Sequence, residues 1–398
     1  MKKKILFMII NMNVGGTEKA LLNMITQMNE DEFDITILML EKSGGFLSSI
    51  PSSVHIEYLR EYKKLKSVLN LPPRIVAAKR FKEGHIIKGF NLLFIHFLSK
   101  IIRSKTIFFK YVLKGIPNFE SEYDIAVAYA GPMDFISYFV AHKIKSKRKI
   151  QWIHFDVTRI GFDKKFAVKV YKRFEKIFVV SDEGRKKLIS LAPIVEDKTE
   201  VFLNVISHEV ILEQSKKNKG FKDGFDGIRI LTVGRLTSEK GQDLAIKALV
   251  KLINAGYNVK WYCLGEGSTR VEYERLVVEY NLEEHFILLG SDPNPYPYMN
   301  ECDIYVQPSR HEGYCITLAE AKCFNKPIVT TNFTGAKEQI NNDVTGLIVS
   351  IDEEEIFKAI KLLLEDRMLY VKLKENLFKE NSGKTNKTSI KNYFVYTN

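Results

Sequence analysis

Short runs of apolar residues alternate along this chain with longer stretches in which apolar residues recur every three or four positions. The short runs have the length of buried strands, and the longer stretches, such as Thr17–Met28, have the spacing of amphipathic helices. Strands that alternate with helices are typical of a parallel sheet covered by helices. In the first half the pattern predicts strands at Lys4–Ile10, Phe33–Leu40, Val54–Leu59, Tyr123–Tyr129, Ile150–Phe155, Ile177–Val180 and Val201–Leu203.

The stretch Ile206–Gly227 interrupts this alternation, because it is rich in glycine and charge and has no apolar period. We therefore predict two Rossmann-like doubly wound parallel-sheet α/β domains that face a central cleft, at residues 1–205 and 228–381, with a linker at 206–227 and a polar tail at 382–398. The second domain is predicted to contain strands Ile228–Val233, Val259–Leu264, Phe286–Leu289, Ile304–Gln307, Ile328–Thr331 and Leu347–Val349 and helices Gln242–Asn254, Arg270–Tyr280, Ile316–Phe324 and Glu353–Leu364.

The composition excludes several classes of protein. Hydrophobic residues make up 45% and aromatic residues 12% of the 398 positions, which excludes disordered and low-complexity chains. No stretch has the roughly 20 apolar residues that span a bilayer. The apolar run after Lys4 is short and lacks a cleavage site, so we interpret it as a buried first strand. The four cysteines lack metal-ligand spacing, so we expect reduced thiols and no metal site.

The positive charge is concentrated in the first half of the chain. Residues 1–200 carry a net charge of +14, whereas the remainder carries −2. Residues 60–115 alone hold 14 basic and 2 acidic side chains among large apolar ones, and Lys143–Lys149 is a further basic run. This mixture favours contact with an anionic membrane surface. The alternatives are a solvated basic face or a nucleic-acid partner, but no nucleic-acid-binding motif is present.

In open α/β sheets, ligands bind at the carboxyl ends of the strands. Two loops at such positions carry candidate chemistry in this sequence. Gly15 and Gly16 precede a helix, where a close backbone approach and a helix N-terminus suit an anion, although a glycine pair can also simply make a turn. Arg235 and Lys240 flank the start of the helix Gln242–Asn254. A cation there is unfavourable for the helix dipole unless an anionic ligand is bound, the alternative being two surface charges in a solvated loop.

A third loop contains Glu312 and, eight positions later, Glu320. On a continuous helix this spacing corresponds to a rise of about 12 Å. That separation exceeds the roughly 5–9.5 Å between the two carboxylates of a glycosidase. It suits an elongated ligand such as a nucleotide-sugar, with one carboxylate for hydroxyl groups at each end and backbone N–H groups between them for the diphosphate. Two unrelated surface glutamates are the alternative.

Together the three loops resemble family-4-type (group 1) retaining glycosyltransferases with the GT-B fold. The resemblance rests on Gly-Gly before a helix near the start, on VGRLTSEKG at 233–241 and on SRHEGYCITLAEA at 309–321. It implies a donor site in which two cations neutralise the diphosphate, Glu312 binds the transferred sugar and Glu320 binds the ribose. The residues it implies for the donor site are Gly15, Gly16, Arg235, Lys240, Gly290, Ser291, Asp292, Glu312, Gly313, Tyr314, Cys315, Ile316 and Glu320. Cys315 departs from the family, which more often has Gly or Pro there.

Family members also have a His at the end of a comparable strand, which here is His154. It is a candidate catalytic or acceptor-positioning residue, and a structural role at the strand end is the alternative. Asp134 and Asp156 are further candidates for an acceptor contact or a helix cap. The sequence has no DxD motif, so we expect Arg235 and Lys240, without a metal, to stabilise the leaving group. The resemblance implies retention of configuration, and we expect front-face attack by the acceptor hydroxyl.

The sequence thus predicts a hexosyltransferase of cell-surface polysaccharide synthesis, cytoplasmic and peripheral on the inner face of the cell membrane. Its donor is expected to be a nucleotide-diphosphate-sugar, with a UDP-sugar preferred over a GDP-sugar. Its acceptor is expected to be a glycan or a lipid-linked glycan. No cofactor and no nucleic-acid partner are expected. The alternatives are a sugar or starch-type synthase, a nucleotide-sugar epimerase, and a non-catalytic nucleotide-sugar-binding protein.

Overall fold

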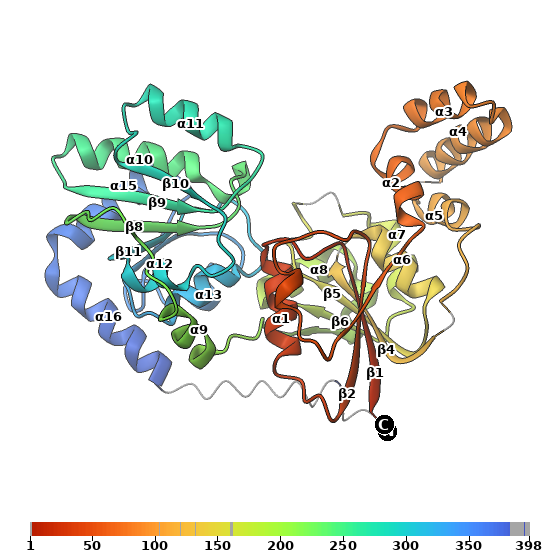
Figure 1. Ribbon diagram of the computed structural model, residues 1–398, viewed down its shortest axis with the longest axis horizontal. Helices are drawn as coiled ribbons and strands as arrows, with labels where there is room; N and C mark the ends of the chain where they lie inside the picture. The colour runs from red at the N-terminus through yellow and green to blue at the C-terminus, as the bar shows by residue number, and fades with distance from the viewer. Residues whose placement is uncertain are drawn as a thin grey trace.

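The computed structural model describes residues 2–102, 104–119, 121–131, 133–159, 162–382 and 394. Over these residues the chain forms two parallel β-sheets that lie side by side, each with helices packed on it (Figure 1). Most of the predicted tail at 382–398 lies outside the described residues. The prediction of two doubly wound parallel-sheet domains is confirmed.

The N-terminal sheet has the strand order β3-β2-β1-β4-β5-β6-β7. Its strands are β1 (Lys3–Ile9), β2 (Phe33–Met39), β3 (His55–Tyr58), β4 (Glu122–Gly131), β5 (Lys145–Ile153), β6 (Lys176–Val179) and β7 (Thr199–Val201). The helices between them are α1 (Gly16–Ile25), α2 (Tyr62–Asn70), α3 (Pro73–Lys82), α4 (Ile86–Ile101), α5 (Thr106–Val112), α6 (Asp134–Lys143), α7 (Lys164–Tyr171) and α8 (Asp182–Leu191).

The C-terminal sheet has the strand order β10-β9-β8-β11-β12-β13. Its strands are β8 (Ile228–Val233), β9 (Val259–Leu264), β10 (Phe286–Gly290), β11 (Ile304–Gln307), β12 (Ile328–Thr331) and β13 (Leu347–Val349). The helices after the first sheet are α9 (His208–Ser215), α10 (Gln242–Asn254), α11 (Arg270–Glu279), α12 (Tyr296–Glu301), α13 (Ile316–Lys322), α14 (Ala336–Gln339), α15 (Glu353–Glu365) and α16 (Arg367–Ser382).

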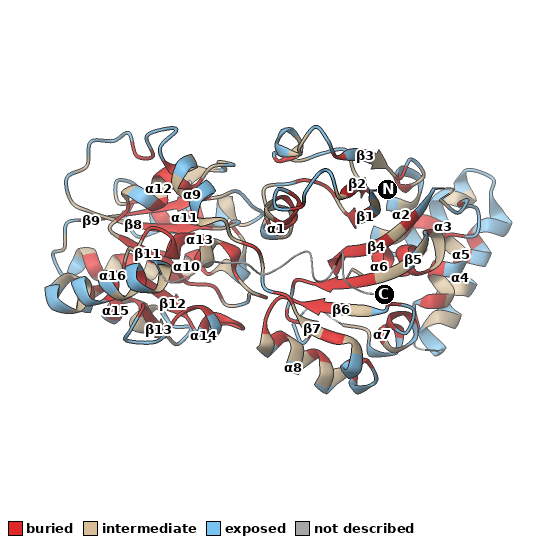
Figure 2. Ribbon diagram, turned by 90° about the horizontal axis from the view of Figure 1, so that it is seen from below, coloured by how far each residue is buried: buried red, intermediate tan, exposed pale blue. Residues whose placement is uncertain are grey.

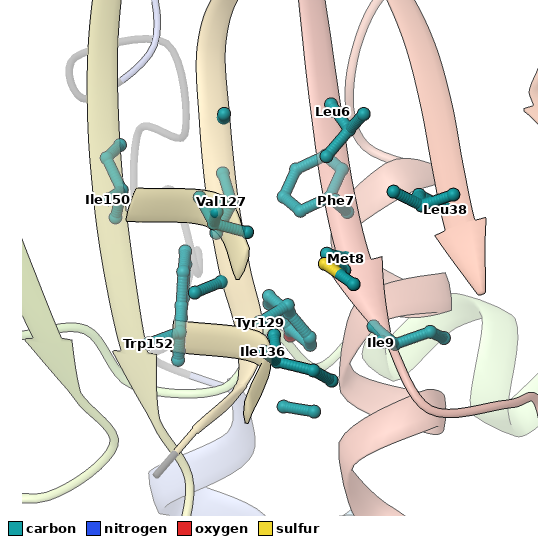
Figure 3. Close-up of a cluster of buried hydrophobic side chains, with 14 of the residues drawn as sticks. Leu6, Phe7, Met8, Ile9, Leu38, Val127, Tyr129, Ile136, Ile150 and Trp152 are labelled. Carbon is teal, nitrogen blue, oxygen red and sulfur yellow. The ribbon is translucent and has the colours of Figure 1, made fainter. Parts of the chain in front are cut away.

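The central strands are apolar on both faces, because helices cover both faces of a doubly wound sheet. In β1, Ile5 to Ile9 are all at most 1% exposed. Figure 3 shows side chains of β1, β2, β4, β5 and α6 packed in one cluster, in which the ring of Trp152 lies close to that of Tyr129 (centroids 5.0 Å apart). Figure 2 shows the buried residues concentrated along both sheets. Burial of these side chains is the main favourable contribution to folding.

The order of strands in each sheet reverses at one point, between β1 and β4 in the first sheet and between β8 and β11 in the second. The loops that follow these strands diverge to opposite faces of the sheet and leave a crevice at its carboxyl edge, where ligands bind. The loop at residues 10–15 follows β1, the loop at 234–241 follows β8, and the loop at 308–315 follows β11. The topology therefore places all three loops singled out in the sequence at crevices of the two sheets.

Direct contacts hold the two domains together on one side of the cleft. The Glu338 carboxylate accepts hydrogen bonds from the backbone N–H groups of Asp182 and Glu183, both at 2.9 Å, at the start of α8. Thr334 donates to Asp156 at 2.8 Å, and Lys187 donates to both. Burial raises the pKa of Asp156, but these hydrogen bonds outweigh it and hold the pKa at about 2. Asp156 therefore joins the domains as a carboxylate.

The segment predicted as a linker contains helix α9, which contacts α12 of the C-terminal domain. Ser207 caps α9, and Ile211 and Ser215 are its buried residues. One turn of buried side chains is too short to produce a clear helical period in the sequence. The exact domain boundaries at 205 and 228 stay a prediction. At the far end of the chain, Phe394 lies in the core of the N-terminal domain, with its ring centroid 6.1 Å from that of Phe7.

Candidate functional site

A cavity of about 800 Å³ lies between the two domains at the carboxyl edges of their sheets. Its volume is in the range typical of sites for small ligands and cofactors. Residues from the N-terminal domain line one wall and residues from the C-terminal domain line the other. Of the residues predicted from sequence, the wall includes Gly15, Gly16, His154, Arg235, Lys240, Ser291, Asp292, Glu312, Gly313, Tyr314, Cys315, Ile316 and Glu320. One hollow thus brings together residues from five separate segments of the chain.

The centre of the C-terminal wall is an ion pair between Lys240 and Glu312. The Lys240 Nζ atom lies 2.6 Å from Glu312 Oε1, and their side chains are only 17% and 9% exposed. Burial lowers the pKa of Lys240, but the adjacent carboxylate outweighs it and raises that pKa above its usual value. Lys240 is therefore a fixed positive charge in the cavity wall. An incoming anion can share this charge with Glu312.

A chain of buried polar side chains orients the Glu312 carboxylate. Ser309 donates to Glu312 Oε1 at 2.8 Å and accepts from Gln307 at 2.8 Å. Gln307 in turn accepts from Tyr305 at 2.8 Å. Tyr305, Gln307 and Ser309 were not predicted from the sequence as site residues. The polar Gln307 in the otherwise apolar strand β11 was the only available signal, because a buried polar side chain needs a partner.

Arg235 lines the cavity beside the ion pair. No carboxylate among the residues of the described ranges lies within 4.0 Å of its guanidinium nitrogens, so this cation is open to a ligand. Glu18, on α1 of the other domain, also lines the cavity, and its charge interacts with that of Arg235. Burial raises the pKa of Glu18, while its own backbone N–H and Arg235 act in the opposite direction. Glu18 was not predicted from the sequence, because its approach to Arg235 depends on how the domains pack.

Glu320 also lines the cavity and is 2% exposed. Tyr296 donates to Glu320 Oε1 at 2.8 Å. Lys19 of α1 approaches from the opposite domain, with its Nζ 5.1 Å from the centre of the Tyr296 ring. Burial raises the pKa of Glu320 and lowers that of Lys19, and each charge favours the other. Neither Tyr296 nor Lys19 was predicted, and only their position in loops and helices at the carboxyl edge could have indicated them.

The backbone between Glu312 and α13 is packed tightly against the N-terminal domain. A Cβ atom on Gly313 would lie 1.9 Å from the His154 carbonyl oxygen, so only glycine fits there. Cys315 has a φ of 61°, in the left-handed region that disfavours side chains with a Cβ. Glycine would adopt this conformation without strain, whereas proline, whose φ is fixed near −65°, would not. Cys315 is buried, and burial raises the pKa of its thiol.

His154 lies at the end of β5, and its side chain is 6% exposed in the cavity wall. Its ring is close to the rings of Tyr129 (4.5 Å) and Trp152 (6.2 Å). Within the described part of the chain, its Nε2 atom has no hydrogen-bond partner. Burial lowers its pKa to about 3, so the imidazole is neutral at physiological pH. A neutral ring with one free nitrogen can bind a hydroxyl group but does not supply a positive charge.

This burial gives a pH dependence of stability that can be measured. The unfolded chain takes up a proton on His154 near pH 6.5, whereas the folded chain does so only near pH 3. Stability is therefore lost as the pH falls below about 6.5, and His154 accounts for about 2 kcal/mol between pH 7.5 and 5. We expect urea unfolding of His154→Gln to show a correspondingly smaller change in free energy between these two pH values. An equal change in both proteins would mean that the folded protein binds this proton.

Three predicted candidates lie outside the cavity wall. Gly290, with a φ of 81°, accepts a hydrogen bond from the Gly265 backbone at 2.7 Å and so supports the loop that carries Ser291 and Asp292. Asp134 pairs with Lys105 at 2.6 Å and is neither a helix cap with a side-chain hydrogen bond nor part of the cavity wall. Asp156 joins the domains, as described above. Asp134 and Asp156 therefore lie outside the wall of this cavity.

Two features, a metal-binding cluster and a membrane-spanning helix, are absent from the described ranges. No group of three or more His, Cys, Asp and Glu side chains in these ranges is arranged to hold a metal ion. None of the helices in them is both long enough and apolar enough to cross a membrane.

Residues 213–380 match the family model described as glycosyl transferases group 1. The chain is 34% identical over 208 residues to N-acetylgalactosamine-N,N'-diacetylbacillosaminyl-diphospho-undecaprenol 4-alpha-N-acetylgalactosaminyltransferase of Campylobacter jejuni, a match that covers 52% of this chain and 55% of that protein. It is 28% identical over 209 residues to the capsular polysaccharide biosynthesis glycosyltransferase CapM of Staphylococcus aureus, covering 48% and 53%. The matched part thus spans about half the length of these curated relatives.

The fold extends over a larger part of the chain than the sequence similarity. The crystal structure of Anabaena HepE in complex with UDP and glucose superimposes with a TM-score of 0.68, covering 96% of this chain and 95% of that one. The sequence identity in this comparison is 17%, so the likeness shows the fold alone. Both sheets and the loops around the cavity therefore belong to one known two-domain architecture.

Proposed function

Because the C-terminal domain belongs to the group 1 glycosyltransferases and the chain has the GT-B fold, we propose that this protein transfers a hexose from a nucleotide-diphosphate-sugar to a glycan acceptor. The observation that carries the proposal is the single cavity lined by Arg235, Lys240, Glu312 and Glu320. Two cations and two carboxylates in one hollow match the charge pattern of a sugar, a diphosphate and a ribose.

Each part of the donor has a matching group in the wall. Arg235 and Lys240 face the diphosphate and stabilise the negative charge that develops on its leaving oxygen as the bond to the sugar breaks. Glu312 is oriented by Ser309 to accept hydrogen bonds from hydroxyl groups of the transferred sugar. Glu320 accepts hydrogen bonds from the ribose, and the loop with Ser291 and Asp292 lies beside the base.

For the chemistry we propose retention of configuration by front-face attack. The acceptor hydroxyl oxygen forms a bond with the anomeric carbon while the bond from that carbon to the donor phosphate oxygen breaks. The departing phosphate oxygen takes the proton of the acceptor hydroxyl, so atoms and charges balance. His154, which is neutral, contributes by hydrogen bonding to a hydroxyl of the sugar or the acceptor rather than by carrying charge.

The names of the compared proteins support a choice of substrates. The HepE complex contains UDP and glucose, and the Campylobacter relative is named for a diphospho-undecaprenol-linked acceptor. The CapM relative is named for capsular polysaccharide synthesis. We therefore propose a UDP-sugar as donor and a lipid-diphosphate-linked or polysaccharide glycan as acceptor. Work on a lipid-linked acceptor would take place at the inner face of the cell membrane.

The test is a two-step substrate screen on the full chain. Calorimetric titration with UDP-glucose, UDP-N-acetylglucosamine, UDP-N-acetylgalactosamine and GDP-mannose identifies the donor. Incubation of that donor with undecaprenyl-diphosphate-linked glycans, followed by mass spectrometry and NMR of the product, identifies the transfer and its stereochemistry. We expect UDP release coupled to one added α-linked hexose. Conversion of the donor without acceptor would indicate an epimerase, and donor binding without any turnover would indicate a non-catalytic binding protein.

A further inference from the structure

Helix α4 exposes a continuous row of large apolar side chains that nothing in the described ranges covers. Ile86, Phe90, Phe94, Phe97 and Ile101 are each between 57% and 62% exposed. We call these five residues the α4 stripe. Monomeric proteins seldom leave so many neighbouring large apolar side chains in water, and such rows mark interaction surfaces.

The spacing of the α4 stripe places it on one side of the helix. Its members follow one another at intervals of four, four, three and four residues, so they fall within an arc of about 80° at 100° per residue. The helix has 16 residues, so the stripe extends over about 24 Å. Leu92, which is buried, lies on the opposite side, and the buried Gly89 lies about 100° around the helix from the middle of the stripe. The α4 stripe is therefore the outer face of an amphipathic helix.

Helices α3 and α4 form a hairpin that projects from the end of the N-terminal domain away from the C-terminal domain (Figures 1 and 2). The inner side of the hairpin is packed, because a Cβ atom on Gly89 would lie 2.3 Å from the Phe81 ring. A small cluster of Val68, Val76 and Leu92, with side chains of α5 against it, joins the hairpin to the domain. The hairpin is thus held in place while its outer face stays free.

The hairpin is also strongly basic. Residues 60–115 include only two acidic positions, Glu61 and Glu83, against 14 basic ones. Four exposed lysines lie on the hairpin, and we call them the basic rim: Lys79, Lys82, Lys88 and Lys100. On α4, Lys100 flanks the stripe, whereas Lys88 lies about 160° around the helix from its middle. By contrast, two residues of the second basic run, Lys143–Lys149, form ion pairs within the N-terminal domain. Lys147 pairs with Asp124 at 2.7 Å, and Arg148 pairs with Glu175 at 2.9 Å. Within the described ranges, Lys79 is the only rim lysine within 4.0 Å of a carboxylate, that of Glu83, so the hairpin retains exposed positive charge.

We propose that the α4 stripe inserts into the surface of an anionic lipid bilayer, with the basic rim at the level of the lipid headgroups. An amphipathic helix with aromatic and aliphatic residues on one face and lysines beside it lies in the plane of the bilayer interface. Exposed lysines gain electrostatic attraction from anionic lipids at the same depth. The helix is too short to span the bilayer, so it lies in one leaflet.

The charge of the surface argues against the other occupants. Two copies of the chain that met through this face would bring two strongly basic hairpins together, each with Glu83 as its one acidic residue. A nucleic acid would match the charge and could stack on the three phenylalanines, but it would leave the aliphatic Ile86 and Ile101 at the two ends of the stripe in water. A bilayer satisfies the apolar stripe and the basic rim together. This inference does not depend on donor chemistry and can be tested without any substrate.

The test is co-sedimentation of the full chain with sucrose-loaded vesicles. Vesicles of phosphatidylglycerol and phosphatidylcholine and vesicles of phosphatidylcholine alone are compared at low and high salt. We expect binding to the anionic vesicles that weakens with salt but persists, because the apolar contribution is not screened. The triple variant Phe90→Ser, Phe94→Ser, Phe97→Ser is expected to bind at least about 50-fold more weakly. The variant Lys79→Gln, Lys82→Gln, Lys88→Gln, Lys100→Gln is expected to lose mainly the salt-sensitive part.

The matched control replaces three comparably exposed apolar residues on α11 and α16 of the C-terminal domain, Val271, Val278 and Phe378, by serine. It should bind vesicles like the unchanged protein. Because the stripe side chains are exposed, we expect thermal unfolding of the triple phenylalanine variant to be close to that of the unchanged protein. Equal vesicle binding by that variant would overturn the proposal. Self-association, or binding of a single-stranded oligonucleotide, that depends on the three phenylalanines without vesicle binding would equally overturn it.

Discussion

Replacing Glu312 by alanine is expected to lower the turnover number by about 100- to 1,000-fold. Its carboxylate is buried in the cavity wall, accepts from Ser309 and pairs with Lys240. A group held in this way stabilises charge and hydroxyl groups at the reacting sugar without reorganisation, and losing one such group costs two to three orders of magnitude. Initial rates of UDP release with saturating donor and acceptor measure the effect.

Two further variants separate chemistry from folding. Removing Glu312 leaves Lys240 buried without its partner, which by itself destabilises the protein. Glu312→Gln keeps the size of the side chain and the hydrogen bond from Ser309, and we still expect a loss of at least about 100-fold. Glu239→Gln changes an exposed carboxylate of the loop after β8 and should leave turnover unchanged. Near-normal turnover of Glu312→Gln, with the fold intact, would contradict the proposed role.

Replacing Lys240 by methionine is the second change with a large expected effect. Methionine keeps the apolar stem but removes the charge that faces the diphosphate. Because the leaving group gains negative charge as its bond to the sugar breaks, we expect kcat/KM to fall by about 100- to 1,000-fold and the affinity for UDP alone to fall as well. Steady-state kinetics and calorimetric titration with UDP measure the two effects separately.

The control for this variant lies on the neighbouring helix. Lys251 of α10 pairs with Glu354 at 2.7 Å at the surface, and Lys251→Met removes a charge there without reaching the cavity. Because Lys240 and Glu312 contact each other, the double variant Lys240→Met, Glu312→Gln should lose less than the product of the two single losses. Unchanged UDP affinity in Lys240→Met would show that this lysine does not contact the diphosphate.

Much of the fold could be predicted from the sequence because its signals are local. The strands β8, β9, β11, β12 and β13 lie where the apolar runs indicate, since a parallel strand covered on both faces is a short continuous apolar segment. Helix α9 was missed because a single turn of buried residues gives no period. The three loops were found because glycines and charges directly after an apolar strand are unusual in a purely structural turn.

Part of the candidate site could likewise be predicted from the sequence, and part could not. The positions of Arg235, Lys240, Glu312 and Glu320 in loops after strands follow from sequence and topology. Their pairing, and the Ser309–Gln307–Tyr305 hydrogen bonds behind Glu312, required the tertiary structure. The positive φ of Cys315 likewise appears only in the structure, because it depends on how the loop turns into α13.

The amino-acid sequence by itself determined the strands, five of the helices, the two-sheet architecture and the loops that carry the candidate chemistry, because periodicity and turn composition act over neighbouring residues. Only the tertiary structure decided which side chains meet across the cleft and which stay in water. Glu18 and Lys19 reach the opposite domain, His154 is buried and neutral, and the phenylalanines of α4, which the sequence alone left as core or surface, are exposed. Burial and charge pairing depend on residues far apart in the chain, and a local pattern does not record them.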